Sequence, residues 1–225
     1  MRTLFQAAVI VITSIVLSGE QREKVLRRLF GHEVHPTARI GLCLIAVDHM
    51  KLGRDAGIGH FTLIKGLRVL DMADETDIGR FNWITGMPLS NTEFYQSVED
   101  RDPSLEIGFG SVIIHRHIID CTNKVTIGEL SGIAGYRCTL LTHGVDIREN
   151  RQSAGPIVIG DRSIISSNCV VIGGTTFPDR SVLAAGSMVR GRNEEPGLYA
   201  GVPAKRVGDL PEDAKFFTRT TKMIY

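Results

Sequence analysis

The sequence predicts an all-β protein, a parallel β-helix built of stacked coils, and three observations lead to this prediction. Large apolar residues recur every six positions over most of the chain. That period matches neither the 3.6-residue repeat of an α-helix nor the alternation of an ordinary strand. Aromatic residues are only 6% of the chain and 24 of its 225 residues are glycine, which suits thin, repetitive β structure better than a thick core.

The repeat is clearest between residues 157 and 192. Its large apolar position is filled at six consecutive steps, by Ile159, Ile165, Val171, Phe177, Leu183 and Val189. The fourth residue after each of the first five is small, namely Ser163, Cys169, Thr175, Ser181 and Ser187. A short strand with one inward side chain, followed by a tight turn, explains both positions. Three such strands and turns form a coil of about eighteen residues, and coils stack.

The same frame continues toward the N-terminus with two-residue slips. Its apolar positions there are Val34, Ile40, Ala46, Leu52, Ile58, Ile64, Leu70, Ile78, Ile84, Ile107, Ile113, Ile119, Val125, Ile127, Ile133 and Thr139. Roughly twenty hexads predict about seven triangular coils over residues 34–192. We expect residues 1–33 to form an N-terminal helical segment and residues 193–225 a closing motif with a short tail.

Two long polar segments interrupt the frame, at residues 85–106 and 144–156. A solenoid accepts insertions at its corners without losing its core, so function is often built in such loops. For the first loop a neutral surface insertion is the favoured interpretation. The second loop follows His143 directly and is the stronger candidate for a functional role.

The last coils and the segment after them, IVIGDRSIISSNCVVIGGTTFPDRSVLAAGSMVRG and GLYAGVPAKRV, resemble the hexapeptide-repeat acyltransferases. The resemblance covers about residues 34–207 and implies a left-handed parallel β-helix, a hand that the period alone does not predict. RHIIDCTNKVTIG and LLTHGVDI add a resemblance to the branch that acetylates sugars of surface polysaccharides. The resemblance implies an acetyltransferase that uses acetyl-CoA and assembles as a homotrimer, with active sites between subunits.

The resemblance also implies the site residues, with His143 as the general base. A sugar hydroxyl is a poor nucleophile, and a neutral imidazole can remove its proton as it attacks a thioester. By motif position, Ser167 and Ala185 are expected to contact the pantetheine of acetyl-CoA, and Arg190 and Lys205 its phosphates. IISSN and RGR depart from the family's usual residues, so these cofactor contacts are less firmly implied than the base.

A second polar group consists of His117, Asp120 and Arg137. His117 and Arg137 take places where the repeat usually has a small residue. The three side chains could hold the acceptor sugar or orient His143. His117 could equally be a structural histidine that is bonded to the backbone.

No metal is expected. His115, His117 and His143 are a conceivable zinc set, but residues 115 and 117 lie on one face of a strand, and the spacing differs from that of β-helix carbonic anhydrases. The four cysteines form no CxxC pair and predict buried, reduced thiols in a cytoplasmic protein; they are Cys43, Cys121, Cys138 and Cys169. A formal net charge of +1 does not indicate a nucleic-acid partner.

The N-terminal segment leaves two interpretations open. Residues 4–17 are apolar apart from Gln6, Thr13 and Ser14, and are short for a spanning helix. The basic, amphipathic REKVLRRLFG follows. Residues 1–30 could touch the inner face of a membrane, or they could form a lid on the β-helix or pack in an oligomer. The activity also has alternatives: an N-acetyltransferase acting on an amino sugar or amino acid, or a non-catalytic β-helix scaffold.

Overall fold

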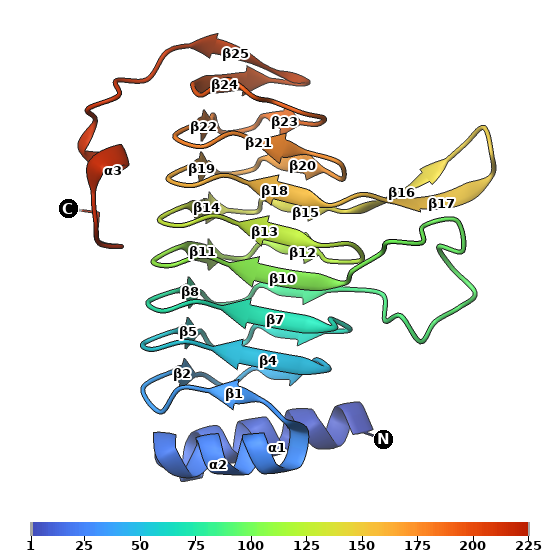
Figure 1. Cartoon of the computed structure of the whole chain (residues 1–225), viewed down its shortest axis with the longest axis vertical. Coiled ribbons are helices and arrows are strands. Elements are labelled where there is room, and N and C mark those ends of the chain that lie inside the picture. The colour runs from blue at the N-terminus through green and yellow to red at the C-terminus, as the bar shows by residue number, and fades with distance from the viewer. Residues whose placement is uncertain (1, 225) are drawn as a thin grey trace.

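The computed structural model describes residues 2–224, with side chains from residue 4 onward. Nearly all of its strands belong to three sheets that run along the whole molecule, stacked coil upon coil (Figure 1). All pairs within these sheets are parallel except the last pair of the second sheet. The predicted parallel β architecture is therefore confirmed.

The three sheets, named A, B and C, take one strand in turn from each coil. Sheet A contains β1 (Glu33–Val34), β4 (His49–Leu52), β7 (Val69–Met72), β10 (Ser104–Ile107), β13 (Val125–Ile127), β18 (Ile157–Ile159) and β21 (Thr176–Phe177). Sheet B contains β2 (Arg39–Ile40), β5 (Gly57–Ile58), β8 (Asp77–Ile78), β11 (Val112–His115), β14 (Gly132–Tyr136), β19 (Ile164–Ile165), β22 (Val182–Leu183), β24 (Leu198–Gly201) and β25 (Ala204–Gly208). Sheet C contains β3 (Leu44–Ala46), β6 (Leu63–Lys65), β9 (Trp83–Thr85), β12 (Ile118–Asp120), β15 (Thr139–Leu141), β20 (Val170–Ile172) and β23 (Met188–Val189).

Each hexad turns its large apolar residue into one continuous core. The frame is confirmed by the burial of Val34, Ile40, Leu52, Ile58, Ile64, Leu70, Ile78, Ile84, Ile107, Ile113, Ile119, Val125, Ile127, Ile133, Ile159, Ile165, Val171, Phe177, Leu183 and Val189. It is one residue off at Ala46 and Thr139, where Ile45 and Leu140 are the fully buried residues. Sheet C pairs Ile45 with the core residue Ile64, so the strand register decides which neighbour points inward.

Three corners join the sheets, and each has its own side chains. The corner from sheet A to sheet B, here the serine corner, stacks Ser111, Ser131, Ser163 and Ser181 on successive coils. The corner from B to C, here the cysteine corner, stacks Thr62, Asn82, His117, Cys138 and Cys169. The corner from C to A, here the His143 corner, is where both long insertions leave the coils. The four cysteines are free and buried, as predicted.

Helices cover the N-terminal end of the coils. α1 (Arg2–Val16) and α2 (Gly19–Phe30) lie side by side beneath β1 (Figure 1). Ser18 begins α2 with a capping box, and Gly31 ends it in the left-handed region, at φ 72°, which favours glycine. None of the described helices combines the length and the apolar character needed to cross a membrane.

The C-terminal tail returns along the outside of the coils. After β25 it contains α3 (Lys215–Thr218) and runs back beside the middle coils (Figure 1). The Lys222 ammonium lies 2.8 Å from the Asp77 carboxylate. Arg180 stacks over the Phe217 ring, so the tail is held on the outside of the coils rather than extending away from them.

Candidate active site

His143 stands at the root of the second insertion, directly after sheet C. The insertion is an antiparallel hairpin of β16 (His143–Asp146) and β17 (Arg151–Ala154) that projects from the coils (Figure 1). The His143 side chain is 44% exposed, and its Nδ1 lies 2.8 Å from Asp120 Oδ2. Asp120 ends β12, one coil below, where it pairs with Leu141. Stacking of coils therefore brings together two residues that are 23 positions apart.

Asp120 is held by donors on every side. Its Oδ2 accepts the backbone N–H groups of Thr142 at 3.0 Å and of His143 at 3.2 Å, and the Thr142 hydroxyl lies 2.5 Å away. Its Oδ1 accepts the Thr122 hydroxyl at 2.7 Å. The carboxylate is only 10% exposed, so these bonds fix its position.

This arrangement determines the tautomer of His143. An ionised carboxylate can only accept hydrogen bonds, so Nδ1 of a neutral His143 must carry the proton. Nε2 then holds the lone pair. A half-exposed imidazole with a free Nε2 and an anchored carboxylate behind it is the arrangement that general-base catalysis requires.

The first insertion, which the sequence favoured as a neutral loop, supplies another side of the site. Its Tyr95 ring meets the His143 ring edge to face, with centroids 6.4 Å apart. Tyr95 is buried, and burial together with the Asp120 charge raises its pKa. Arg101 lies 5.1 Å from the centre of the Tyr95 ring. The pair of aromatic residues Phe94 and Tyr95 within a polar insertion was the signal that sequence reasoning could have used.

Arg101 anchors the first insertion to the coils. Its guanidinium is buried and donates to the carbonyl oxygens of Met87, Pro88 and Thr122, the last two at 3.2 and 3.3 Å. The two insertions also touch each other, because the Ser97 hydroxyl donates to Gln152 O at 3.4 Å. His143, the first residue of β16, is therefore in contact with the first insertion as well as the second. Both insertions project from the same side of the molecule (Figure 1).

The structure does not bring His117 to His143. β12 begins immediately after His117 and ends at Asp120, so His117 and His143 lie at opposite ends of the strands of sheet C. His117 is fully buried in the cysteine corner, and its Nδ1 accepts the backbone N–H of Cys138 at 3.0 Å. Burial and the nearby His115 lower its pKa to about 4. A side chain buried in this way suits a structural role rather than the expected contact with a sugar.

Arg137 also lies away from His143. β14 contains a bulge, since Ile113 pairs with Ile133 but His115 pairs with Tyr136. The extra residue moves Arg137 into the exposed turn, at φ 61°, and gives the buried corner position to Cys138. Of the three residues in this polar group, only Asp120 therefore reaches His143.

No cluster of three or more His, Cys, Asp or Glu side chains suited to a metal ion occurs within residues 2–224. His115 is engaged otherwise, because its Nδ1 accepts the Arg80 backbone N–H at 2.8 Å. His117 and His143 occupy different corners. The three histidines of the conceivable zinc set are therefore not assembled within the chain.

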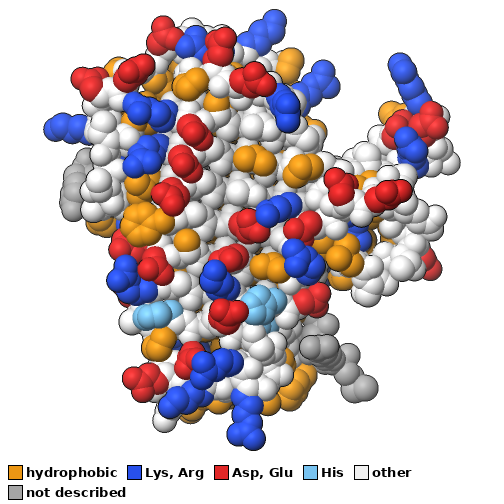
Figure 2. Space-filling model, viewed as in Figure 1, with side chains coloured by type: hydrophobic (Ala, Val, Ile, Leu, Met, Phe, Trp, Pro, Cys, Tyr) orange, Lys and Arg blue, Asp and Glu red, His pale blue; other side chains and the backbone are white. Residues whose placement is uncertain are grey.

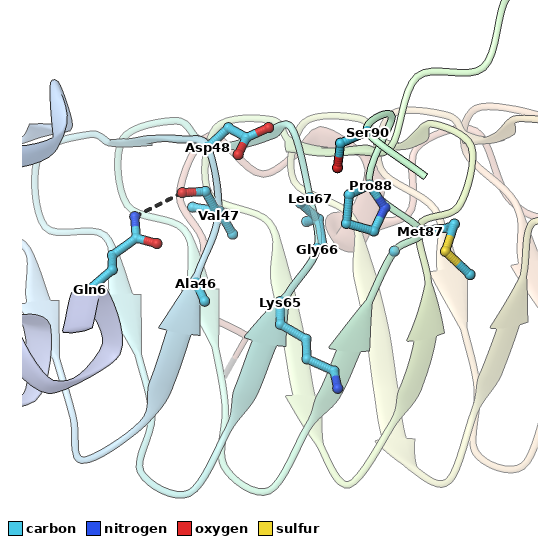
Figure 3. Close-up of a pocket in the computed structure, with 11 residues that line it drawn as sticks. Gln6, Ala46, Val47, Asp48, Lys65, Gly66, Leu67, Met87, Pro88 and Ser90 are labelled. Carbon is cyan, nitrogen blue, oxygen red and sulfur yellow. Dashed lines mark hydrogen bonds between the residues drawn. The ribbon is translucent and has the colours of Figure 1, made fainter. Parts of the chain in front are cut away.

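A groove of about 500 Å³ lies along the His143 corner at the N-terminal coils (Figure 3). Lys65 and Leu67 form part of its wall, and Met87, Pro88 and Ser90 at the base of the first insertion form another. His143 does not line this groove. The base of the first insertion separates the two, because Arg101 binds the Met87 and Pro88 carbonyls and stacks on Tyr95.

Comparison with known proteins identifies the fold. No family model matches the chain, and no curated protein matches it significantly. Among solved structures, the polysialic acid O-acetyltransferase OatWY superposes with a TM-score of 0.59 at 17% identity, covering 79% of this chain and 84% of its own. This chain has the fold of the hexapeptide-repeat acetyltransferases. The resemblance inferred from the sequence is thus confirmed at the level of the fold.

Two further solved structures are similar in fold. The hexapeptide-repeat containing acetyltransferase VCA0836 from Vibrio cholerae has a TM-score of 0.50 at 20% identity, covering 93% of this chain and 91% of its own. A mutant of AntD, an N-acyltransferase from Bacillus cereus in complex with dTDP-4-amino-4,6-dideoxyglucose and coenzyme A, also has a TM-score of 0.50, at 11% identity. That comparison covers 87% of this chain and 92% of AntD.

The expected cofactor residues are spread over the hexapeptide-repeat coils. Ser167 and Ala185 lie on successive coils at the cysteine corner, where Gly186 N donates to Ser167 O at 3.0 Å. Arg190 follows β23 and is exposed, and Lys205 is exposed on β25. Sheet C separates Ser167 and Ala185 from the His143 corner of the same chain.

Proposed function

We propose that this chain is an acetyltransferase that moves the acetyl group of acetyl-CoA to a sugar hydroxyl, in the synthesis of a surface polysaccharide or a lipid-linked glycan. One observation carries the proposal: the Asp120–His143 pair leaves Nε2 free between two insertions. The fold supports it, because acetyltransferases such as OatWY are built on the same coils.

In the proposed reaction both substrates are bound together and no acyl-enzyme forms. The acceptor oxygen attacks the thioester carbonyl while His143 Nε2 takes the hydroxyl proton. The tetrahedral intermediate then collapses, the carbon–sulfur bond breaks, and the imidazolium returns the proton to the CoA thiolate. Asp120 stabilises the imidazolium and keeps Nδ1 facing away from the substrates.

We further propose that Ser167 and Ala185 line the pantetheine path, and that Arg190 and Lys205 bind the CoA phosphates. Ser167 and Ala185 lie across sheet C from His143, which supports a homotrimer in which neighbouring subunits complete one site. The outer side of sheet C and its cysteine-corner edge expose large apolar residues that a neighbour could cover: Leu44, Phe61, Phe81, Trp83 and Ile118. His117 then has a structural role, and Asp120 acts through His143.

The finer features of the fold belong to the same proposal. We infer about seven left-handed, triangular coils over residues 34–192, a helical segment at residues 1–33 and a closing segment at residues 193–225. We place the enzyme in the cytoplasm, with residues 1–30 at the inner face of the membrane, where carriers of lipid-linked glycans are found.

The proposal is tested by measuring acetyl-CoA binding and acetyl transfer together. We expect calorimetry to give micromolar binding for the wild type and for His143→Ala alike, while His143→Ala lowers turnover on its acceptor at least ~100-fold. His35→Ala is the matched control, because His35 is exposed at the N-terminal end of the coils and should leave turnover unchanged.

Each other outcome has a defined meaning. Near-normal turnover of His143→Ala would remove His143 from the mechanism. If neither protein binds acetyl-CoA, the non-catalytic scaffold becomes the better interpretation. An acceptor panel with matched hydroxyl and amino sugars distinguishes O-acetylation from N-acetylation.

A further inference from the structure

The outer face of α1 is apolar along its whole described length. Leu4, Phe5, Ile12, Ile15 and Val16 recur at helical spacing and are 58–79% exposed. The buried side of the same helix holds Gln6 and Thr13 beside Ala7 and Ile10. The helix thus turns its polar side chains toward the protein and its largest apolar ones outward, the reverse of an ordinary surface helix.

Specific hydrogen bonds fix this orientation. The Gln6 amide donates to Val47 O at 2.8 Å and lies 2.8 Å from His32 Nε2, as Figure 3 shows for the first of these bonds. The Thr13 and Ser14 hydroxyls bond to backbone carbonyls of the helix itself, at 2.8 and 2.6 Å. Rotating α1 to hide its outer side chains would break the bond from Gln6 to the first coil, so the apolar stripe is a fixed feature of the surface.

Basic side chains of α2 stand beside this stripe. Lys24, Arg27 and Arg28 are exposed, and of these only Arg27 takes part in an ion pair among the described residues, with Glu23 at 3.0 Å. Figure 2 shows Lys and Arg side chains next to exposed hydrophobic ones at the end of the molecule where the helices lie. An apolar surface with free cations at its edge is complementary to a bilayer that contains anionic lipid.

We propose that α1 and α2 dock the protein on an anionic membrane surface, with α1 lying in the plane of the interface. Fifteen residues span only ~22 Å, too short to cross a bilayer but long enough to bury one face among headgroups and acyl chains. A second copy docked here about a twofold axis would bring the same cations together, which disfavours that occupant. This inference deepens the membrane location proposed above by naming the docking surface and the lipid charge, and it does not depend on acetyltransferase activity.

The full-length protein is sedimented with vesicles of phosphatidylcholine mixed with phosphatidylglycerol, and with vesicles of phosphatidylcholine alone. We expect the wild type to bind the mixed vesicles more strongly, and Ile12→Glu/Ile15→Glu to lower its partitioning at least ~10-fold. Lys24→Glu/Arg28→Glu should remove the preference for phosphatidylglycerol. Val207→Glu, an exposed apolar residue at the opposite end of the coils, is the control and should bind as the wild type does.

Two results would overturn the proposal: wild type that stays in solution with both kinds of vesicle, or α1 variants that keep vesicle binding and change only the molar mass in solution. The second result would assign the stripe to contact between copies. Circular dichroism and acetyl-CoA binding are measured on the same variants. Both should be unchanged, so failure of docking and failure of the proposed function are distinguishable.

Discussion

The serine corner and the His143 corner are built from the same repeat, yet they use polar side chains in opposite ways. At the serine corner each hydroxyl serves the backbone of neighbouring coils. Ser163 Oγ accepts the N–H of Ser181 at 3.1 Å and donates to Pro178 O at 2.7 Å, and Ser131 makes the corresponding pair of bonds one coil below. These hydroxyls are fully engaged in hydrogen bonds that hold the coils together.

At the His143 corner the polar groups converge on one carboxylate instead. Two backbone N–H groups, two hydroxyls and the imidazole of His143 surround Asp120. Because the carboxylate is so well anchored, Nδ1 of His143 is engaged and Nε2 is left available. The comparison shows that a regular wall becomes a candidate site when donors gather on a group that can in turn orient a titratable side chain.

Among the changes that distinguish the two corners, substitution of Asp120 should have the largest effect on turnover. We expect Asp120→Ala to lower turnover at least ~100-fold, because His143 loses both its orientation and the charge that stabilises its imidazolium. Asp120→Asn should be less severe, since the N–H groups of Thr142 and His143 favour an amide oxygen at the same place. Steady-state kinetics on the two variants separates the loss of orientation from the loss of charge.

The matched control for Asp120 is Asp161→Asn, near the serine corner. Asp161 Oδ1 accepts the Glu129 N–H at 2.7 Å, but no titratable side chain depends on it among the described ion pairs. Turnover of the Asp161→Asn variant should stay close to that of the wild type. Equal losses in the Asp120 and Asp161 variants would mean that the effect is general destabilisation.

The second prediction concerns pH and the buried histidines, which belong to the structural part of the molecule. Burial lowers the pKa of both His32 and His117 to about 4. In the unfolded chain the histidine pKa is near 6.5, so the unfolded state binds more protons than the folded state between about pH 4 and about pH 6.5. The free energy of unfolding is therefore highest, as far as these two histidines determine it, above about pH 6.5, and it falls as the pH is lowered toward about 4. The loss should be of the order of 3 kcal/mol for each histidine.

Urea unfolding at about pH 7.5 and about pH 4.5 measures this loss. The informative variant is His117→Asn, because Asn82 already occupies the corresponding position one coil below, where its Oδ1 accepts the His117 N–H at 2.9 Å. We expect the variant to lose roughly half of the pH dependence that the two histidines cause, and His32 to retain the other half. An unchanged pH dependence would contradict the assignment to His117.

The positions set by the repeat could be predicted from the sequence, whereas the loop contacts of the His143 corner could not. The hexad fixes the core because one inward side chain in each strand is a local requirement. The bulge in β14 is invisible in the pattern, so the expected places of Thr139 and Arg137 were displaced by one residue. Asp120 and His143 become neighbours once the coil length is known, whereas the contact of Tyr95 depends on the path of a loop that has no repeat to define it.

The third prediction weakens the serine corner alone. Ser163→Ala leaves the buried N–H of Ser181 and the carbonyl of Pro178 without their hydroxyl partner. We expect the free energy of unfolding to fall by about 1–3 kcal/mol, and turnover to stay unchanged. Ser90→Ala, at an exposed serine, is the control for urea unfolding. A loss of turnover without a loss of stability would show that the two corners are coupled.

The smallest expected effect concerns Tyr95, the residue by which the first insertion reaches the His143 corner. Tyr95→Ala removes the ring edge beside His143 and the face on which Arg101 stacks, so we expect kcat to fall about tenfold, as for a positioning residue. Tyr95→Phe keeps both ring contacts and should change kcat by no more than about threefold. Phe94→Ala, the exposed neighbour in the same loop, is the matched control.

The division between kcat and KM decides what Tyr95 does. If Tyr95→Ala raises KM for the acceptor and leaves kcat alone, the ring is a wall of the acceptor pocket and does not position His143. If neither constant changes, the first insertion is a neutral loop after all, and orientation of His143 rests on Asp120 alone. In that case the His143 corner would differ from the serine corner only because the hydrogen-bond donors of one coil converge on the Asp120 carboxylate. That is the smallest change by which a repeat could produce a catalytic base.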